Sequence, residues 1–224
     1  RRLVLEVVTV RIELGSCNAV SGANGAGKSA LLAAIGGWVA PQRGHVRLNG
    51  QTLTRLPPDR RARLGLASAP QLPLGFPRLS VADHLRAAFQ RGRGWARYAP
   101  WVEKAVRSRA IRLALGPLDA RAAALPHGHR KRLDLEVALI GKPAVVLLDE
   151  PTAGLGPRER EIMVDRLRGL KAALLIVEHD MDVVAALANW VSVLHGGRIV
   201  AQGPPEQVAQ DACAQDVYLG HARR

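Results

Sequence analysis

The chain has 224 residues, 48% of them hydrophobic but only 4% aromatic, so Ala, Leu, Val and Ile must build its core. This favours one large domain of helices packed on a buried parallel sheet. The sequence shows neither an apolar run long enough to span a membrane nor a signal for secretion at its N-terminus, so we expect a cytosolic protein. The net charge of +13 comes mostly from scattered Arg. This pattern favours a compositional bias as its cause, with proximity to a membrane as the second explanation and binding of nucleic acid as the third.

The first part of the chain contains the signals of a strand, a glycine-rich loop and a helix. Alternating apolar and polar side chains over residues 3–14 predict a half-buried edge strand. An apolar run over 17–20, a glycine-rich turn and apolar residues at helical spacing over 28–39, up to Trp38, follow. Residues 44–50 alternate again and end in Asn-Gly, a turn signal.

The middle of the chain changes to helical sequence rich in Ala and Arg, over residues 80–121. Ser80 and Asp83 give it a start that resembles a capping box. We interpret it as an α-helical insertion in a single domain over 1–224. The predicted helical subdomain covers approximately 72–129, and the core covers 1–71 and 130–224.

The last part alternates helices and strands. An amphipathic helix is predicted over 130–141, with Leu133, Val137 and Ile140 on one face, and a continuous apolar run over 144–148 predicts a central parallel strand. The remaining predictions are a helix over 157–170, a strand over 173–177, a helix over 181–189 and strands over 191–194 and 198–201.

A phosphate-binding loop is the strongest motif. It reads Gly22-Ala23-Asn24-Gly25-Ala26-Gly27-Lys28-Ser29, followed by Ala30, between a predicted strand and a predicted helix. Its glycines allow backbone N–H groups to surround phosphate oxygens, and the helix N-terminus adds its positive end. Lys28 is expected to bridge the β- and γ-phosphates of a nucleotide, and Ser29 to ligate Mg²⁺.

Two adjacent carboxylates, Asp149 and Glu150, follow the apolar strand at the end where ligands bind in open α/β sheets. Asp149 is expected to hold Mg²⁺ through water, and Glu150 to polarise the attacking water as general base. An Asp-Glu pair can also simply cap a strand or a helix. The phosphate loop is what favours the functional interpretation.

Two further residues are candidates for contact with the nucleotide. His179 follows the strand over 173–177, so its ring could hydrogen-bond the γ-phosphate, although a lone His is more often structural. Gln71 lies between the core and the helical insertion, where a sensor of the metal or the water could move with the helical lobe. A Gln beside Pro is otherwise an ordinary loop residue.

Taken in order, these motifs resemble the ATP-binding subunit of ABC transporters over nearly the whole chain. Residues 22–30 resemble the Walker A motif, 145–150 Walker B, Gln71 the Q-loop, 153–156 the D-loop and His179 the switch histidine. The resemblance implies a P-loop NTPase (RecA-like) α/β core with a parallel sheet, an N-terminal antiparallel β segment and the helical insertion. It further implies that the chain binds ATP and Mg²⁺ and hydrolyses ATP.

The resemblance also implies roles and partners. The implied catalytic residues are Glu150, His179 and Gln71, and the implied metal residues are Ser29, Gln71 and Asp149. A second ATPase subunit, identical or different, faces the first head to tail, and transmembrane permease subunits bind both at the cytoplasmic face of the membrane. A periplasmic solute-binding protein takes part indirectly, and no nucleic acid is expected.

A narrower resemblance concerns the transported solute. Residues 147–154, 177–184 and 217–220 resemble the ATPases of branched-chain amino acid importers. We therefore expect an importer of branched-chain amino acids. The ATPases of importers for urea or short amides share much of this sequence and are the alternative.

The sequence departs from the family at the signature, which reads Leu125-Pro126-His127-Gly128-His129. Pro126 replaces a Ser whose hydroxyl would bind the partner's γ-phosphate, whereas Gly128 keeps its backbone donor and both His could add contacts at a helix N-terminus. Residues 1–21 also contain no aromatic side chain to stack on adenine. An active importer ATPase is the first expectation, and a nucleotide-binding subunit with impaired hydrolysis is an alternative. A soluble ATPase acting on nucleic acid is a further alternative that rests on the net charge alone.

Overall fold

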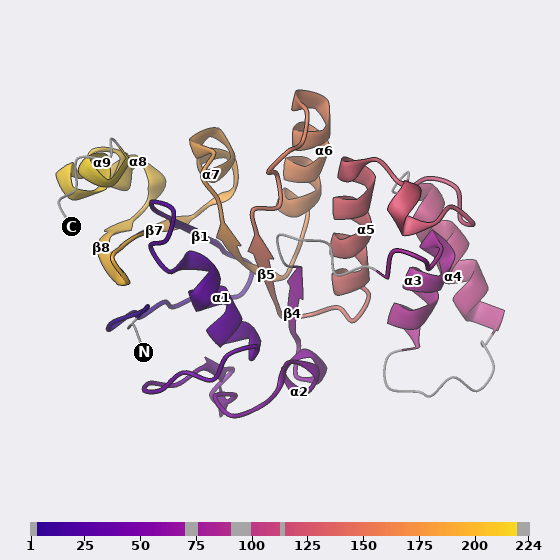
Figure 1. Ribbon diagram of the computed structural model, residues 1–224, viewed down its shortest axis with the longest axis horizontal. Coiled ribbons are helices and arrows are strands. Elements are labelled where there is room, and N and C mark those ends of the chain that lie inside the picture. The colour runs from indigo at the N-terminus through magenta and orange to yellow at the C-terminus, as the bar shows by residue number, and fades with distance from the viewer. Residues whose placement is uncertain (1–3, 70–75, 91–99, 113–114, 219–224) are drawn as a thin grey trace.

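The computed structural model describes residues 4–69, 76–90, 100–112 and 115–218 (Figure 1). A six-stranded sheet forms its centre, in the order β4-β5-β6-β1-β7-β8. These strands are β1 (Cys17–Ser21), β4 (Leu66–Ala69), β5 (Val145–Asp149), β6 (Ala173–Val177), β7 (Trp190–His195) and β8 (Arg198–Gly203). The first five in the sheet order run parallel and β8 pairs antiparallel with β7.

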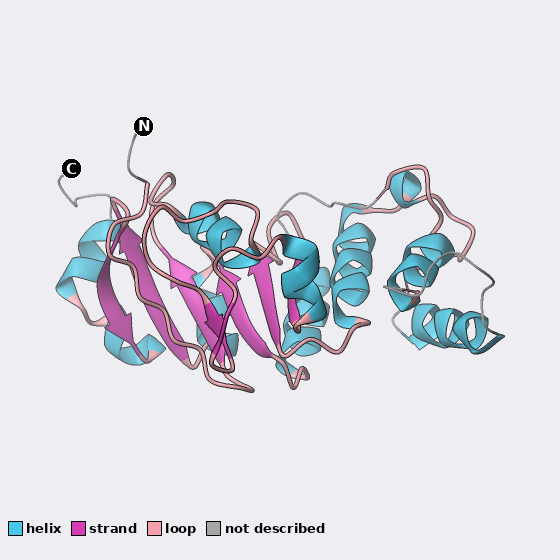
Figure 2. Cartoon of the chain, turned by 90° about the horizontal axis from the view of Figure 1, so that it is seen from below, coloured by secondary structure: helices cyan, strands magenta, loops and turns pink. Residues whose placement is uncertain are grey.

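Helices cover both faces of this sheet (Figures 1 and 2). On one side lie α1 (Lys28–Gly36) and α2 (Pro58–Arg63). On the other lie α5 (His127–Leu139), α6 (Pro157–Arg168), α7 (Met181–Leu187), α8 (Pro205–Ala209) and α9 (Ala212–Tyr218). Within the described residues, none of the helices is both long and apolar enough to cross a membrane.

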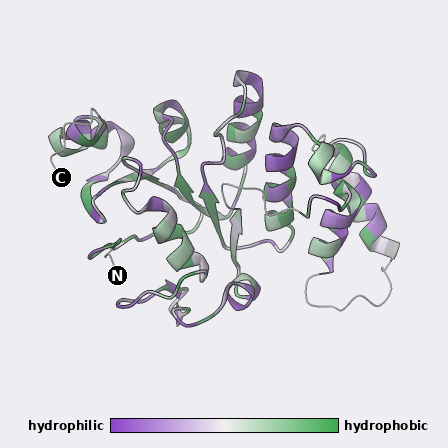
Figure 3. Ribbon diagram, in the orientation of Figure 1, coloured by the Kyte–Doolittle hydropathy of each residue, from purple (hydrophilic) through white to green (hydrophobic). Residues whose placement is uncertain are grey.

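The central strands are apolar throughout because both of their faces are covered. Along β5, Val146 and Leu148 join the cluster under α5, α6 and α7, whereas Val145 and Leu147 join the cluster under α1. In Figure 3 α1 is coloured mostly as hydrophobic and α5 mostly as hydrophilic. The predicted α/β class with a largely parallel sheet is confirmed.

The prediction of a strand over residues 3–14 is wrong for its described part, since residues 4–14 form no strand. Leu5, Val8, Val10 and Ile12 do pack partly buried against the cluster under α1, which explains the alternation. The backbone, however, turns at Val7, whose φ is 50°. The alternation therefore reports burial without strand pairing. An antiparallel pair forms later, between β2 (Arg47–Leu48) and β3 (Gln51–Thr52), around the predicted Asn-Gly turn.

Two predicted helices end or begin elsewhere. The first stops at Gly36 because Gly37 takes a left-handed conformation, with φ 88°, so Trp38 lies beyond the helix and is largely exposed. The helix predicted over 130–141 already begins at His127, because Pro126 stands at the N-cap, where no N–H group is needed. The later elements form where predicted, with slightly shifted ends.

The C-terminal end of α1 is closed by a buried arginine from α2. Arg61 is 1% exposed, and its guanidinium donates to the carbonyl oxygens of Ala34 and Ile35 in the last turn of α1. It also donates to Thr54 at 2.8 Å and Leu56 at 2.8 Å. A cation at this position satisfies carbonyl groups that the helix leaves unpaired.

The helical lobe consists of α3 (Val81–Phe89), α4 (Pro100–Arg112) and a short 3-10 turn (Ala122–Ala124), which pack with one face of α5. The predicted capping box is confirmed, since Ser80 and Asp83 exchange hydrogen bonds at the start of α3. Leu133, Val137 and Ile140 belong to this lobe's core, as the predicted face required. The helix α5 crosses the predicted boundary at 129/130, and it packs on the sheet as well as on this lobe. The division of the chain at 129/130 stays a prediction.

A buried carboxylate joins the lobe to the rest of the molecule. Glu136 of α5 is 2% exposed at its side chain and lies 2.6 Å from Arg109 of α4 and 2.6 Å from Arg166 of α6. Both arginines are less than one third exposed. One carboxylate therefore fixes three helices to each other.

We predict that Glu136→Ala lowers the free energy of unfolding by about 3 kcal/mol, because it leaves two poorly solvated guanidinium groups without their anion. Urea denaturation of the full chain measures this change. The control is Asp165→Ala, which removes an exposed ion pair with Arg168 within α6 and should cost no more than about 0.5 kcal/mol. Equal losses in the two variants would contradict the role of Glu136.

Candidate phosphate-binding site

The predicted phosphate loop connects β1 to α1, as expected, and two of its glycines are required by close packing. Gly22 has φ 142°, and a Cβ atom there would lie 2.0 Å from the carbonyl oxygen of Leu194 in β7. Gly27 has φ 110°, and a Cβ atom there would lie 2.7 Å from Leu5. Only glycine allows the loop to pass this close to its neighbours.

Lys28 fills the inside of the loop. Its side chain is buried, and Nζ donates to the carbonyl oxygens of Gly22 at 2.7 Å and Ala23 at 3.0 Å. Burial lowers the pKa of the ammonium group, while the charges of Glu150 and Asp149 act to raise it. Phosphate oxygens could replace these carbonyl groups as acceptors, so the lysine is already in place for an anion.

Asp149 ends β5 directly opposite Val177, the last residue of β6, so the carboxyl ends of both strands meet at one edge. Burial raises the pKa of its carboxyl group, whereas the hydrogen bond with the Ser29 hydroxyl acts to lower it. Both groups offer the hard oxygen ligands that Mg²⁺ prefers, with phosphates and water completing the shell. Ser29 and Asp149 therefore fit the predicted metal role.

Glu150 and His179 point toward one another, with 2.9 Å between Oε1 and Nε2. Glu150 has φ 49°, a left-handed conformation that costs a residue with a side chain roughly 1–2 kcal/mol. Its carbonyl oxygen accepts a hydrogen bond from Lys131 Nζ of α5 at 2.5 Å. The predicted base and the predicted switch histidine thus lie beside Asp149, and Gln71 lies outside the described residues.

Sequence reasoning missed two residues of this region, Glu178 and Lys131. Glu178 is 2% exposed, and its carboxylate accepts from the N–H and the hydroxyl of Thr152, at 3.0 and 2.6 Å, and from the N–H of His179 at 3.2 Å. It therefore ties the loop after β5 to the loop after β6. A charged residue directly after a buried strand was the signal that could have revealed it.

The predicted signature residues do not join this cluster. They stand at the start of α5, where His127 Nε2 lies 3.3 Å from the carbonyl oxygen of Ala153. A Cβ atom at Gly128 would lie 2.3 Å from a carboxylate oxygen of Glu159, so a larger residue here would require the Glu159 side chain to move. Burial lowers the pKa of the half-buried His129. His127 and Gly128 thus contact the segment 153–159 of their own chain.

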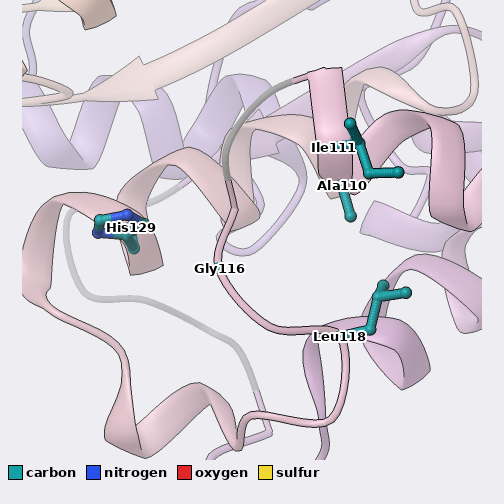
Figure 4. A pocket seen from close by; sticks show the side chains of 5 residues that line it. All are labelled: Ala110, Ile111, Gly116, Leu118 and His129. Atoms are coloured by element: carbon teal, nitrogen blue, oxygen red, sulfur yellow. The ribbon is translucent and has the colours of Figure 1, made fainter.

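A hollow of about 540 Å³ lies in the helical lobe and not at the phosphate loop (Figure 4). It is lined by Ala110, Ile111, Gly116, Leu118 and His129. Figure 4 shows His129 across the hollow from Ala110 and Ile111, so the hollow separates the start of α5 from the end of α4. Among the described residues that line it, His129 alone is titratable.

Comparison with known proteins gives consistent results. A protein family described as "ABC transporter" matches residues 5–153. The lipopolysaccharide export system ATP-binding protein LptB of Acidithiobacillus ferridurans is 33% identical, over 98% of this chain and 92% of its own length. A probable branched-chain amino acid transport ATP-binding protein, LivF of Archaeoglobus fulgidus, is 32% identical, over 97% of this chain and 92% of its own. The solved structure of an ABC transporter cassette in its ADP conformation has a TM-score of 0.85 at 25% identity, covering 97% of this chain and 92% of its own.

The loop geometry predicts different effects at two glycines. Gly22→Ala should lower the free energy of unfolding by about 3 kcal/mol or more, because the added methyl group overlaps the backbone of β7. It should also abolish binding of a fluorescent ATP analogue. Gly25→Ala is the matched control, since its φ of 80° costs only about 1 kcal/mol and open space surrounds it. Urea denaturation and equilibrium titration measure both quantities, and similar effects at both positions would contradict the role of close packing at Gly22.

Proposed function

The chain belongs to the ABC transporter family, and we propose that it is the subunit that binds and hydrolyses Mg-ATP to drive a solute across a membrane. The observation that carries this proposal is the Glu150–His179 pair beside the phosphate loop, at the edge where β5 and β6 end. Lys28 and Ser29 supply the groups that hold phosphate and metal on the other side of this edge. The family's ATP-hydrolysing activity requires these groups together.

Each residue has a defined task in this proposal. Lys28 leaves its two carbonyl partners to hold the β- and γ-phosphates, with the N–H groups of the loop around them. Ser29 and Asp149 would hold Mg²⁺, which neutralises charge on the phosphates. Glu150 accepts a proton from the attacking water, and His179 Nε2 orients Glu150 or contacts the γ-phosphate.

A second subunit would complete the site. His127 and Gly128 contact segment 153–159 of their own chain, so within one subunit they leave the phosphate loop without a cover. A head-to-tail pair would place the start of α5 against the partner's nucleotide, where its positive end suits an anion. Pro126 brings no hydroxyl to that contact, which favours slower turnover than a Ser would give.

The proposed partners follow from the same assembly. Transmembrane permease subunits would contact the helical lobe, so the protein would lie at the cytoplasmic face of the membrane without entering it. A periplasmic solute-binding protein would act indirectly, by delivering solute to the permeases. The net charge does not indicate nucleic-acid binding, because the basic residues are scattered along the chain.

For the solute, we propose branched-chain amino acids. The LivF relative, whose printed name includes this transport, aligns with nearly the whole chain. The stretches 147–154 and 177–184, which resemble that subfamily, cover the ends of β5 and β6 and the loops that follow them, and the second continues into α7. The LptB relative is 33% identical and its name refers to lipopolysaccharide export, so export is the alternative outcome of a transport assay.

Replacing the proposed base should separate binding from turnover. We predict that Glu150→Gln lowers the rate of phosphate release from Mg-ATP at least about 100-fold, because the amide cannot accept a proton. Its affinity for Mg-ATP should stay within about twofold, since the phosphate loop is unchanged. Steady-state phosphate release and equilibrium titration measure the two quantities.

The outcomes distinguish the two forms of the proposal. An unchanged rate in Glu150→Gln would rule out Glu150 as the base. If the unmodified chain binds Mg-ATP without measurable turnover, even with its permeases, the binding-only alternative holds. Recovery of turnover in Pro126→Ser would then assign the defect to the start of α5.

Uptake assays test the solute. When the chain is reconstituted with the permeases encoded beside its gene, ATP-dependent accumulation of radiolabelled leucine in vesicles is the expected result. The Glu150→Gln assembly is the control and should accumulate none above background. ATP-dependent uptake of urea or release of lipopolysaccharide, without leucine uptake, would overturn the proposed solute but not the proposed ATPase.

A further inference from the structure

The backbone of Glu150 is held at both of its polar atoms. Its N–H donates to the carbonyl oxygen of Val177 at 2.9 Å, which extends the β5–β6 ladder by one residue. Its carbonyl oxygen accepts two hydrogen bonds, from the N–H of Ala153 at 3.2 Å and from Lys131 Nζ at 2.5 Å. Between these contacts the residue takes a left-handed conformation, with φ 49°.

This conformation decides where the carboxylate points. A residue with a side chain rarely adopts φ near 50° unless surrounding contacts impose it. With this backbone, Glu150 directs Oε1 to Nε2 of His179 at 2.9 Å. A peptide that relaxed to an ordinary conformation would carry the side chain away from His179, because the direction of a side chain follows its backbone.

Lys131 contacts this backbone from a helix outside the β5–β6 pair. It lies on α5, the helix that begins at Pro126 and packs both on the helical lobe and on the sheet. Burial lowers the pKa of its ammonium group. The charges of Glu178, Glu150 and Asp149, which lie close by, act to raise it. The side chain thus reaches from α5 into the edge where β5 ends.

We infer that Lys131 is a positioning residue, which holds the Glu150 backbone in its left-handed conformation and so links the orientation of α5 to the aim of the base. The inference rests on the proposed function, in which Glu150 accepts the proton of the attacking water. When α5 shifts, Lys131 moves with it, and the carbonyl group of Glu150 loses or regains its charged donor. The base is then correctly aimed only when α5 stands in the position that brings Lys131 to the Glu150 carbonyl group.

Kinetics of the full chain test the inference. Lys131→Met keeps the length of the side chain and removes the donor, and kcat for Mg-ATP should fall about 10–100-fold, as small misplacements of catalytic groups do. KM and the affinity for Mg-ATP should stay within about twofold, because the phosphate loop is not touched. Lys131→Arg keeps a charged donor and should recover at least about one third of kcat.

The control is Lys142→Met, which removes an exposed lysine just beyond the end of α5 and should change neither constant. In a Glu150→Gln background, Lys131→Met should lower the residual rate no further, because a residue that acts through the base has nothing left to aim. Losses that multiply, or a change in KM alone, would overturn the inference.

Hydrogen exchange decides the structural part without any turnover. Amide exchange in segment 150–153 should rise about tenfold or more in Lys131→Met, and should stay at the original rate in Lys131→Arg and Lys142→Met. Unchanged exchange in Lys131→Met overturns the inference, even if the unmodified chain proves inactive. If exchange rises and kcat does not fall, while Glu150→Gln abolishes turnover, the proposed function stands and the inference is wrong.

Discussion

The parallel register of β1, β6 and β5 is the constraint on which the site depends. Val20 lies opposite Val177, and Asp149 lies opposite the same residue from the other side, so three strands end at one edge. Residues from distant parts of the chain therefore arrive together: the phosphate loop after β1, the carboxylates after β5 and His179 after β6. A shift of one residue in any pair would also exchange the apolar side chains between the two faces of the sheet.

Buried ionic groups then determine how the loops at this edge are held. Glu178 ties two loops together, and Glu136 ties α5 to α4 and α6. Each of these carboxylates is almost fully removed from water and satisfied by several donors. Such groups add little stability compared with apolar residues of the same size, but they are costly to leave unpaired. They consequently favour a single arrangement of the loops and helices that they join.

The sequence predicts those parts of the molecule whose chemistry is local. The phosphate loop, the strand before Asp149 and the capping box at Ser80 each depend on residues a few positions apart, and the structure contains all three. Contacts that join distant residues leave no such pattern. Lys131 reaches a carbonyl group 19 positions away and Glu178 a hydroxyl group 26 positions away, so the sequence indicates neither contact, although the position of Glu178 directly after a buried strand marks it as a candidate. Alternation over residues 4–14 was misleading for a related reason, because burial and strand pairing produce the same periodicity.

Arg61 gives the phosphate-loop helix a fixed anchor at its far end. Its guanidinium binds carbonyl groups of α1 and of residues 54–56 together, so the helix cannot slide along its axis without pulling on α2. In turn, α2 packs against β4, the strand after which the chain leaves the sheet toward the helical lobe. A push on α1 by an arriving triphosphate would therefore load the edge strand β4 by two routes, directly from α1 and through the buried cation and α2.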